Sequence, residues 1–445
     1  MVVVKQRSDR LDAPDYSVED VTALIERYDE PEWLAGFRQA CWSLYEDLPM
    51  PSTQDEAWRR TDYSFIDWRQ AAKLVRGEGG SLDAVPEESL APLVGEEEGA
   101  MMVFVDGELV HYKMPDALAE QGVIFKEVRQ AAREDEELLK ANLMTKAVKP
   151  TDGKFAALNG ALFNFGWFVH VPEGVTAEIP MHIVVYNQQD GAQMGHSLVV
   201  VEENAEATVV VDYLSPPGQD ESSYIGATEL LVGDAANLRY VALQDWNRQT
   251  FEFSHQRARV GKQGNLDWIL GTFGSTLFKS FIELELDGKG ANGRVSGFFF
   301  VNEDQHYDLD TQQNHNAPLT TSDLLFKGAG KDTARSVWQG MIKSLPQMQK
   351  IDGFQASRNL LLSDDVRMDG IPGLEIEADD VICSHAATFG SLEEQPIYYL
   401  MSRGIPRNQA ELMLIEGFFD ELLQRIPFER VVGRLEEAVE AKILS

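Results

Sequence analysis

The chain has 445 residues, 44% of them hydrophobic and 25% charged, a composition typical of folded globular proteins and not of disordered ones. One ordinary globular core rarely holds so many residues, so we expect two or three structural units or one elongated unit. The 73 acidic and 39 basic residues give a formal charge of -34, which disfavours binding to nucleic acid or to an anionic membrane surface.

The sequence also indicates the cellular compartment. Residues 1–17 contain only a short apolar run before charged residues begin, unlike the apolar core of a secretory signal. No segment approaches the ~18 consecutive apolar residues of a membrane helix, and two cysteines cannot form a disulfide framework. We therefore expect a cytoplasmic protein with reduced thiols and no membrane span. The acidity also fits a high-salt cytoplasm, which composition alone does not decide.

Residues 1–98 are predicted to form an N-terminal helical domain. Ser17 followed by Asp20 is a capping-box pattern, and Pro31 suits the first turn of a second helix. The apolar residues of that second helix recur on one face: Leu34, Phe37, Cys41, Leu44, Tyr45 and Leu48. Cys41 is therefore expected to be a small core residue, and the polar residues 77–99 are expected to connect this domain to the next.

Residues 99–391 are predicted to form a core domain that opens with a hairpin and a helix before residue 150. The segment AMMVFVDGELVHY surrounds Asp106-Gly107, a pair typical of tight hairpin turns. Residues 125–144 have the amphipathic spacing of a single charged helix. After Lys154 the pattern becomes that of an all-β region, with short β-branched and aromatic segments separated by Gly, Asn and Asp.

These β segments are periodic. Small turn residues recur at steps of 30, 30, 28 and 27 residues, at Ala177, Ala207, Asn237, Asn265 and Asn292. Degenerate repeats of this length indicate a solenoid, because each coil can bury its inward face only against its neighbours. A parallel β-helix is the favoured architecture. A β-sandwich is the alternative, although it has no reason to repeat one turn over so many units.

Residues 392–445 are predicted to form a C-terminal helical domain. A first helix ends at Gly404, a second begins near Pro406, and a third follows in the last residues. The second helix has apolar and small residues at helical spacing: Ala410, Met413, Leu414, Gly417, Phe418 and Leu422. These helices either cover the open end of the solenoid or present an apolar face to a partner.

The sequence predicts no nucleotide site in this chain. Gly330-Lys331 is followed by Asp332 where a phosphate-binding loop needs Ser or Thr, and the first glycine of that loop is missing. No CxxC, HExxH, GxSxG or GxGxxG pattern occurs either.

The densest polar cluster is QHYDLDTQQNHN. His306, Asp308 and Asp310 alternate, so on a strand all three project from one face, and His315 follows at a distance that a turn could close. Two imidazoles and two carboxylates could bind zinc or ferrous iron, which would suit a metal-dependent β-helix enzyme. An outward polar ladder, or buried histidines bonded to neighbouring carboxylates, is the more ordinary interpretation.

The segment DDVICSHAATFG contains the second cysteine. Cys383 and His385 lie two residues apart, so a strand would place both on one face with Ser384 on the other. A thiol beside an imidazole suits soft metal ions, iron-sulfur units or sulfur transfer. Two ligands do not complete a tetrahedral site, so the others come from elsewhere in the chain, from a second protein, or the pair is packing.

The segment GLEIEADDVICSHAATFGSLEEQPIYYLMSRGIPRNQAELMLIEGF resembles the C-terminal signature of the SufB/SufD family of iron-sulfur cluster assembly proteins. Residues 30–68, 305–328, 336–343 and 357–364 support the resemblance, which covers nearly the whole chain. The resemblance implies a mainly β fold, a right-handed parallel β-helix flanked by N-terminal and C-terminal α-helical domains.

Two departures place the sequence nearer the SufD branch of that family. SufB-type members have a functional cysteine and a glutamate at the positions of Ser357 and Ala386. The resemblance then implies a non-catalytic scaffold subunit, with His385 as a ligand of a transient iron-sulfur cluster at the interface with a SufB-like subunit and Cys383 as a secondary ligand or a buried thiol.

The same resemblance implies further partners. A SufC-like ABC ATPase would bind the C-terminal helices, at Arg403, Gly404, Ile405, Ala410, Met413, Leu414, Gly417 and Phe418. Reduced flavin could supply electrons to the assembled complex, and the isolated chain could form a homodimer.

Overall fold

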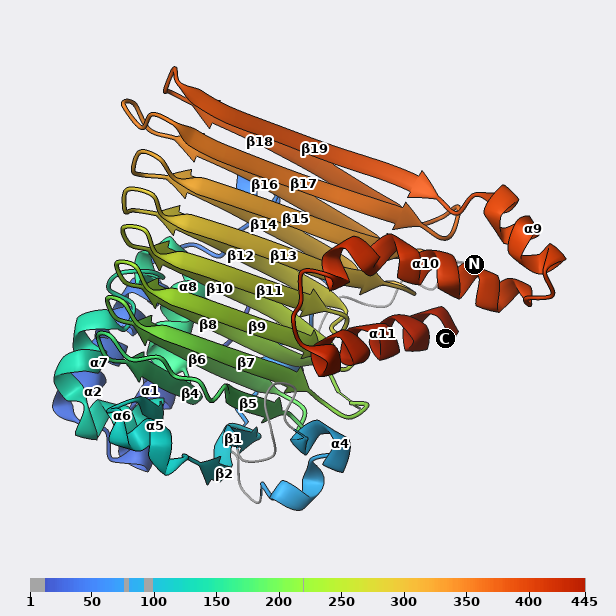
Figure 1. Cartoon of the computed structure of the whole chain (residues 1–445). Helices are drawn as coiled ribbons and strands as arrows, with labels where there is room; N and C mark the ends of the chain where they lie inside the picture. The colour runs from blue at the N-terminus through green and yellow to red at the C-terminus, as the bar shows by residue number, and fades with distance from the viewer. Residues whose placement is uncertain (1–12, 76–79, 92–98, 219, 445) are drawn as a thin grey trace.

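The computed structural model describes residues 13–75, 80–91, 99–218 and 220–444. Parts of the predicted N-terminal segment 1–17 and of the predicted connecting segment 77–99 therefore lie outside the described residues. In the described part, the strands form two long sheets that face each other (Figure 1). The neighbours within each sheet are strands that alternate along the chain.

One sheet has ten strands, in the order β19-β17-β15-β13-β11-β9-β7-β5-β1-β2. Its members are β1 (Ala100–Val105), β2 (Glu108–Lys113), β5 (Met181–Tyr186), β7 (Glu206–Leu214), β9 (Asn237–Asp245), β11 (Asn265–Thr272), β13 (Asn292–Val301), β15 (Thr321–Gly330), β17 (Ile351–Leu361) and β19 (Val381–Ser391). We call it the odd sheet.

The other sheet, the even sheet, has nine strands in the order β18-β16-β14-β12-β10-β8-β6-β4-β3. Its members are β3 (Ile124–Glu127), β4 (Phe165–Val171), β6 (Ala192–Val201), β8 (Ser222–Val232), β10 (Thr250–Val260), β12 (Leu277–Leu286), β14 (His306–His315), β16 (Arg335–Ser344) and β18 (Arg367–Ile376).

Each coil contributes one strand to each sheet, which makes a parallel β-solenoid of about eight turns and confirms the predicted β-helix. Asn237, Asn265 and Asn292 are in register on β9, β11 and β13. Their side chains form a ladder, in which Asn265 Nδ2 donates to Asn237 Oδ1 (3.0 Å) and Asn292 Nδ2 donates to Asn265 Oδ1 (3.3 Å). Parallel pairing one repeat apart excludes the β-sandwich alternative.

The residues just before these strands explain the regular step. Asn204, Ala235, Gln263 and Leu319 have φ between 54° and 62°, and Gly290 has φ of 75°. The chain therefore turns through the left-handed region at the same point of successive coils. Asn204 and Gly290 are residue types that favour this region, whereas at Ala235, Gln263 and Leu319 the geometry of the coil imposes it.

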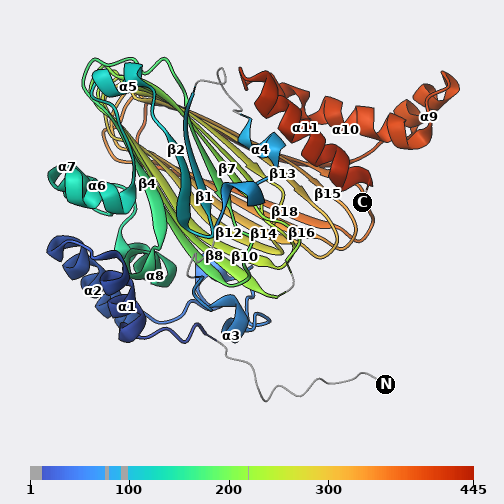
Figure 2. The same ribbon diagram turned by 90° about the horizontal axis from the view of Figure 1, so that it is seen from below.

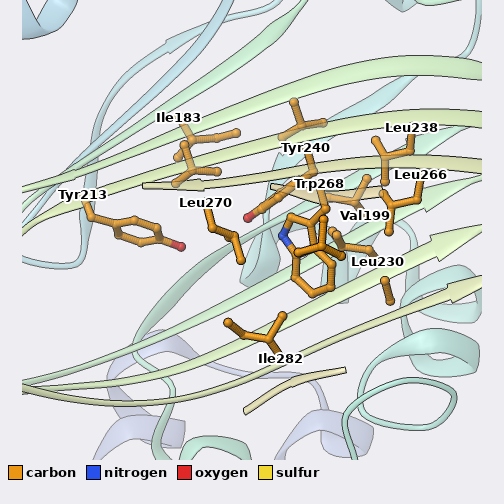
Figure 3. Packing of buried hydrophobic residues seen from close by; sticks show 14 of the residues in the cluster. Ile183, Val199, Tyr213, Leu230, Leu238, Tyr240, Leu266, Trp268, Leu270 and Ile282 are labelled. Carbon is orange, nitrogen blue, oxygen red and sulfur yellow. The ribbon is translucent and has the colours of Figure 1, made fainter. Parts of the chain in front are cut away.

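The main core lies between the two sheets (Figure 3). Val199, Leu230, Leu238 and Leu266 are at most 2% exposed and point toward one another from both sheets, with Trp268 beside them. Burying one such side chain contributes about 1.5–3 kcal/mol. The inward face of each coil is thus stabilised only by stacking on the next, as expected for a solenoid.

The N-terminal helices cover the outer face of the even sheet (Figure 2). These are α1 (Val18–Tyr28), α2 (Glu32–Asp47) and α8 (Lys154–Leu162), with α3 (Trp68–Ala71), α6 (Val128–Glu134) and α7 (Glu136–Asn142) around them. Phe155 stacks on Phe253 of β10 with ring centroids 4.3 Å apart. Cys41 is buried in this layer, which confirms it as a core residue, and burial raises its pKa to about 12. The short helices α4 (Glu87–Leu90) and α5 (Asp116–Glu120) lie beside the first strands.

The C-terminal helices are α9 (Glu394–Ser402), α10 (Arg407–Leu423) and α11 (Glu429–Leu444). α10 and α11 lie across the outer face of the odd sheet and bury Ile415, Phe419 and Leu435 against it (Figure 1). The expectation that they cover the open end of the solenoid is therefore wrong. The outer side of the odd sheet is itself apolar, with Val241, Ile269 and Phe298 buried beneath the helices.

The first helix and the first hairpin form as their sequence patterns predict, whereas the helix predicted after them does not. The Ser17–Asp20 capping box and the hairpin around Asp106-Gly107 are confirmed. The single helix over residues 125–144 is wrong, because Ile124–Glu127 pairs with β4 and the Glu127 carboxylate then accepts hydrogen bonds from the first backbone N–H groups of α6. Among the described residues, no helix is both long and apolar enough to cross a membrane.

Candidate functional site

Cys383 and His385 lie on β19, the last strand of the odd sheet. In the parallel register Cys383 is opposite Gly353 and His385 is opposite Gln355 of β17. The Cys383 sulfur lies 3.3 Å from the position that a Cβ on Gly353 would occupy, and Gln355 is fully buried with its amide nitrogen donating to the Gly373 carbonyl (2.8 Å). Both candidate ligands therefore face the interior of the solenoid.

The position of this strand explains the exposure of the pair. β18 and β19 are the last strands of their sheets, so within the described residues no further coil stacks on them. His385 is exposed and Cys383 is half-buried. Partial burial raises the pKa of the Cys383 thiol, while a hydrogen bond from the backbone N–H of Gly353 opposes that effect. The thiol is thus mainly protonated at neutral pH.

The two edge strands also expose apolar side chains, which we call the apolar rim. Ile371, Leu374, Ile382 and Phe389 on β18 and β19 are 37%, 39%, 72% and 44% exposed. An edge strand with unpaired backbone groups and exposed apolar side chains is a template for pairing with another chain. The terminal coil therefore has the physical character of a protein interface.

The two positions that separate the family branches are not ligands here. Ser357 is fully buried, and its hydroxyl accepts a hydrogen bond from Asn359 Nδ2 (2.9 Å). Ala386 packs partly against the core beneath the C-terminal helices. The rim thus offers only Cys383 and His385 as strong metal donors from this strand.

The second candidate cluster is divided by the sheet. Tyr307 and Leu309 point into the core, so His306, Asp308 and Asp310 lie on the outer face of β14. Asp308 is buried there, 3.1 Å from the equally buried Lys279 ammonium, and accepts a hydrogen bond from the hydroxyl of Thr61 (2.5 Å). This carboxylate is already neutralised and holds the N-terminal segment against the sheet.

His315 lies on the opposite face of the same strand. Its side chain is buried inside the solenoid, bonded to the hydroxyls of Thr320 (2.7 Å) and Ser322 (2.9 Å). The strand continues to residue 315, which lies five positions after Asp310, and an odd step along a strand reverses the direction of the side chain. The four residues therefore do not form one site, and the described part of the chain contains no group of three or more His, Cys, Asp or Glu side chains arranged for a metal ion.

The C-terminal helices have their own exposed surface. Of the predicted partner-binding residues, Arg403, Gly404, Met413 and Gly417 are exposed, Ile405, Leu414 and Phe418 are half-buried, and Ala410 is buried. Tyr398 and Tyr399 of α9, which the sequence reasoning did not select, are 75% and 57% exposed. Adjacent aromatic residues in PIYYLMSR were the available signal, because large exposed aromatics are enriched at interfaces.

Comparison with known proteins identifies the family. A family model described as "SUF system FeS cluster assembly, SufBD core domain" matches residues 184–418, and "SufBD protein N-terminal region" matches residues 19–183. The chain belongs to the SufBD family. The resemblance noted in the sequence is thereby confirmed over most of its length.

Individual SufBD proteins show which branch is nearer. The iron-sulfur cluster assembly protein SufD of Bacillus subtilis (strain 168) is 31% identical over 431 residues, which cover 96% of this chain and 97% of that protein. A SufBD family protein of Staphylococcus epidermidis is 28% identical over 421 residues, 93% of this chain and 90% of that protein. The chain is a SufD-like iron-sulfur cluster assembly protein.

Proposed function

We propose that this chain is a non-catalytic, cytoplasmic scaffold subunit of SufD type. It would pair with a SufB-like subunit through its terminal coil and bind a SufC-like ATPase through its C-terminal helices. The observation that carries the proposal is the uncovered last coil, where Cys383 and His385 lie within an exposed apolar rim.

The edge of the solenoid supports the pairing. A homologous solenoid can continue both sheets by adding its own last strands to β18 and β19, which would satisfy the free backbone groups and bury Ile382 and Phe389. Without that partner, two copies of this chain could pair through the same edges and form a homodimer.

Half of a metal site suits such an interface. His385 would supply one ligand to the nascent cluster, with Cys383 as a secondary ligand, and the partner would supply the rest. The cluster is the cargo of the complex, so ligands shared between two subunits favour release, because separating the subunits removes part of the coordination. Reduced flavin bound to the assembled complex would supply electrons.

The C-terminal helices support a mechanical role for the ATPase. α9 and the start of α10 project beyond the strands (Figures 1 and 2), and expose Tyr398, Tyr399 and Met413. α10 is fixed to the odd sheet, since Lys327 Nζ of β15 donates to the Phe418 carbonyl (2.6 Å) and pairs with Glu421 (2.9 Å). Movement of α10 can therefore reach β15 and the strands beyond it.

Bound nucleotide would act through these contacts. Closure of two ATPase subunits moves the helices that hold them, and so shifts the equilibrium between two arrangements of the interface. This division of labour places the nucleotide chemistry in the partner and explains why a chain with this role needs no phosphate-binding loop of its own.

Reconstitution tests the proposal. The chain is co-expressed with SufB-like and SufC-like subunits, the complex is isolated, and iron, sulfide and reductant are added under anaerobic conditions while cluster absorption is recorded. We expect His385→Ala to preserve the complex and abolish most cluster formation, and Ser384→Ala, on the opposite face of the same strand, to behave like the unaltered chain. Failure of the subunits to associate would refute the scaffold role, and full cluster formation by His385→Ala would refute the role of His385.

A further inference from the structure

Beneath the terminal coil, the interior of the solenoid contains a thiol and an imidazole close to the backbone of Gly353. A Cβ added to Gly353 would lie 3.3 Å from the Cys383 sulfur and 3.3 Å from His315 Nε2, with Ile342 Cγ2 at 3.2 Å. A thiol and an imidazole nitrogen therefore converge on the space that the missing side chain of Gly353 leaves. His315 belongs to β14 and Cys383 to β19, so this convergence joins residues 68 positions apart in the sequence.

The hydrogen bonds of His315 fix its tautomer. The Thr320 hydroxyl donates to the Ala317 carbonyl (3.0 Å), so at 2.7 Å from His315 Nδ1 it can only accept. Nδ1 therefore carries the proton, and the lone pair of Nε2 accepts a hydrogen bond from the Ser322 hydroxyl (2.9 Å). Burial lowers the pKa of His315 to about 4, so the ring is neutral at physiological pH.

This is the arrangement of a histidine that is ready to bind a metal. Ligating histidines typically donate their second ring N–H to an oxygen acceptor, which orients the ring and fixes the lone pair on the other nitrogen. Here Thr320 holds Nδ1–H in that way, and Nε2 faces the space at Gly353. Gln313 Nε2 donates to the Ser322 hydroxyl oxygen (2.7 Å), so the Ser322 proton is available to His315 Nε2.

Two buried side-chain oxygens without partners lie in the same part of the solenoid interior. Gln313 and Gln355 are at most 1% exposed, and the side-chain oxygen of each has no hydrogen-bond partner among the described residues. Gln313 Nε2 also donates to the backbone carbonyl of Phe354 (3.1 Å), the residue after Gly353. Such buried oxygens are satisfied if water occupies the interior here, and bound ions in proteins commonly keep water as a ligand.

We propose that Cys383 and His315 form an interior site for a single thiophilic divalent metal ion in the space over Gly353. Thiolate sulfur and imidazole nitrogen together suit zinc and ferrous iron, with bonds of about 2.3 Å and about 2.0 Å. Binding displaces the Ser322 hydroxyl from Nε2 and releases the thiol proton to solvent, so the ion binds a thiolate. That the ion carried in the cell is ferrous iron rests on the proposed function.

The size of the space distinguishes this site from the rim. A methyl group would already be in tight contact with both donors and Ile342, so the space admits one ion and excludes a cluster. Two protein donors leave other coordination positions to water, which favours exchange over permanent binding. The site would hold iron one layer below His385, from which it could pass to the interface.

Cobalt binding to the full-length chain tests the site. Co²⁺ is added anaerobically, and the charge-transfer absorption between thiolate and cobalt is recorded. We expect one equivalent to saturate the signal. Gly353→Ala should abolish it by filling the space without removing a donor, and Cys383→Ser should abolish it by removing the sulfur. His315→Gln should raise the apparent Kd at least about tenfold, the loss that follows removal of even an outer partner of a metal ligand.

Controls separate this site from the proposed function. A Cβ at Gly390, on β19 with Cys383, meets nothing within 4 Å, so Gly390→Ala should bind cobalt like the unaltered chain. His385→Ala should also bind cobalt normally, although we expect it to fail in cluster formation by the complex. The absence of a thiolate-cobalt signal, or equal binding by Gly353→Ala or His315→Gln with an intact circular dichroism spectrum, would overturn the interior site and leave the role of His385 untouched.

Discussion

The buried ion pair between Lys279 and Asp308 gives the most quantitative test of how the N-terminal segment is held. Both side chains are fully buried, and their charged atoms are 3.1 Å apart. Asp308→Ala would leave the Lys279 ammonium buried among aromatic rings; its nitrogen is 4.6 Å from the ring centroid of Phe281. Removing one partner of a buried pair typically destabilises a protein by 3–5 kcal/mol. Loss of the Thr61 hydrogen bond adds about 1 kcal/mol.

The loss of stability should depend on whether one charge of the pair is removed or both. Asp308→Ala is expected to lower the free energy of unfolding by about 5 kcal/mol, whereas the double variant Lys279→Met, Asp308→Leu removes both charges and should lie within about 1 kcal/mol of the original chain. Asp369→Asn, which breaks a largely exposed pair with Arg367, should change stability by less than about 0.5 kcal/mol.

Urea unfolding followed by tryptophan fluorescence measures these differences, because Trp58 lies beside Lys279 with the ammonium 5.8 Å from its ring centroid. The effect of Asp308→Ala should also persist at high salt, since a buried pair is poorly screened. Equal losses for Asp308→Ala and for the double variant would refute the reasoning, because they would show that packing and not an uncompensated charge sets the stability.

Three further predictions concern other parts of the molecule. Phe419→Ala should destabilise the packing of α10 by about 3–5 kcal/mol, since its ring stacks on that of Phe298 in the odd sheet with centroids 4.2 Å apart. Limited proteolysis should then release the C-terminal helices of this variant, whereas Met413→Ala, at an exposed side chain, should remain resistant. Burial raises the pKa of Glu252 to about 7, so between about pH 4.5 and 7 the folded chain binds more protons than the unfolded chain and loses stability as pH rises. The free energy of unfolding of Glu252→Gln, relative to that of the original chain, should therefore rise by about 3 kcal/mol between pH 5 and pH 8. Parallel unfolding profiles of the two chains would contradict this. Ile382→Lys should weaken association with a SufB-like subunit by tenfold or more in a pull-down titration, while Val18→Lys, at an exposed apolar residue of α1, should have no effect.

The fold was predictable because its repeat is carried by local chemistry. Asn237, Asn265 and Asn292 mark equivalent places of successive coils, and the same coil length brings distant residues together. Lys279 and Asp308 are 29 residues apart, and Gly353 and Cys383 are 30 apart, so each pair is one coil apart and in register. Moving one coil length along the sequence from a buried polar residue leads to its neighbour in the sheet, and this step could have identified Lys279 as the partner of Asp308.

Other features depend on tertiary packing that no local pattern contains. Residues 125–144 have a helical pattern, yet Ile124–Glu127 joins β4 because the even sheet offers a partner. The end of β14 could not be located from sequence, so His315 was expected near Asp310, whereas a continued strand turns it inward. On α10 the sheet buries Ile415 and Phe419 and leaves Met413 exposed, since the direction from which the sheet approaches decides which face of the helix is covered.

The asparagine ladder has a consequence for how such proteins can change in length. Because Asn237, Asn265 and Asn292 occupy equivalent places, a whole coil could be inserted or removed between them without altering any residue at either end. Each added coil would move the rim that bears His385 away from the N-terminal helices by one strand spacing, about 4.8 Å. The separation between the two ends of the molecule is thus restricted to discrete values set by the number of coils.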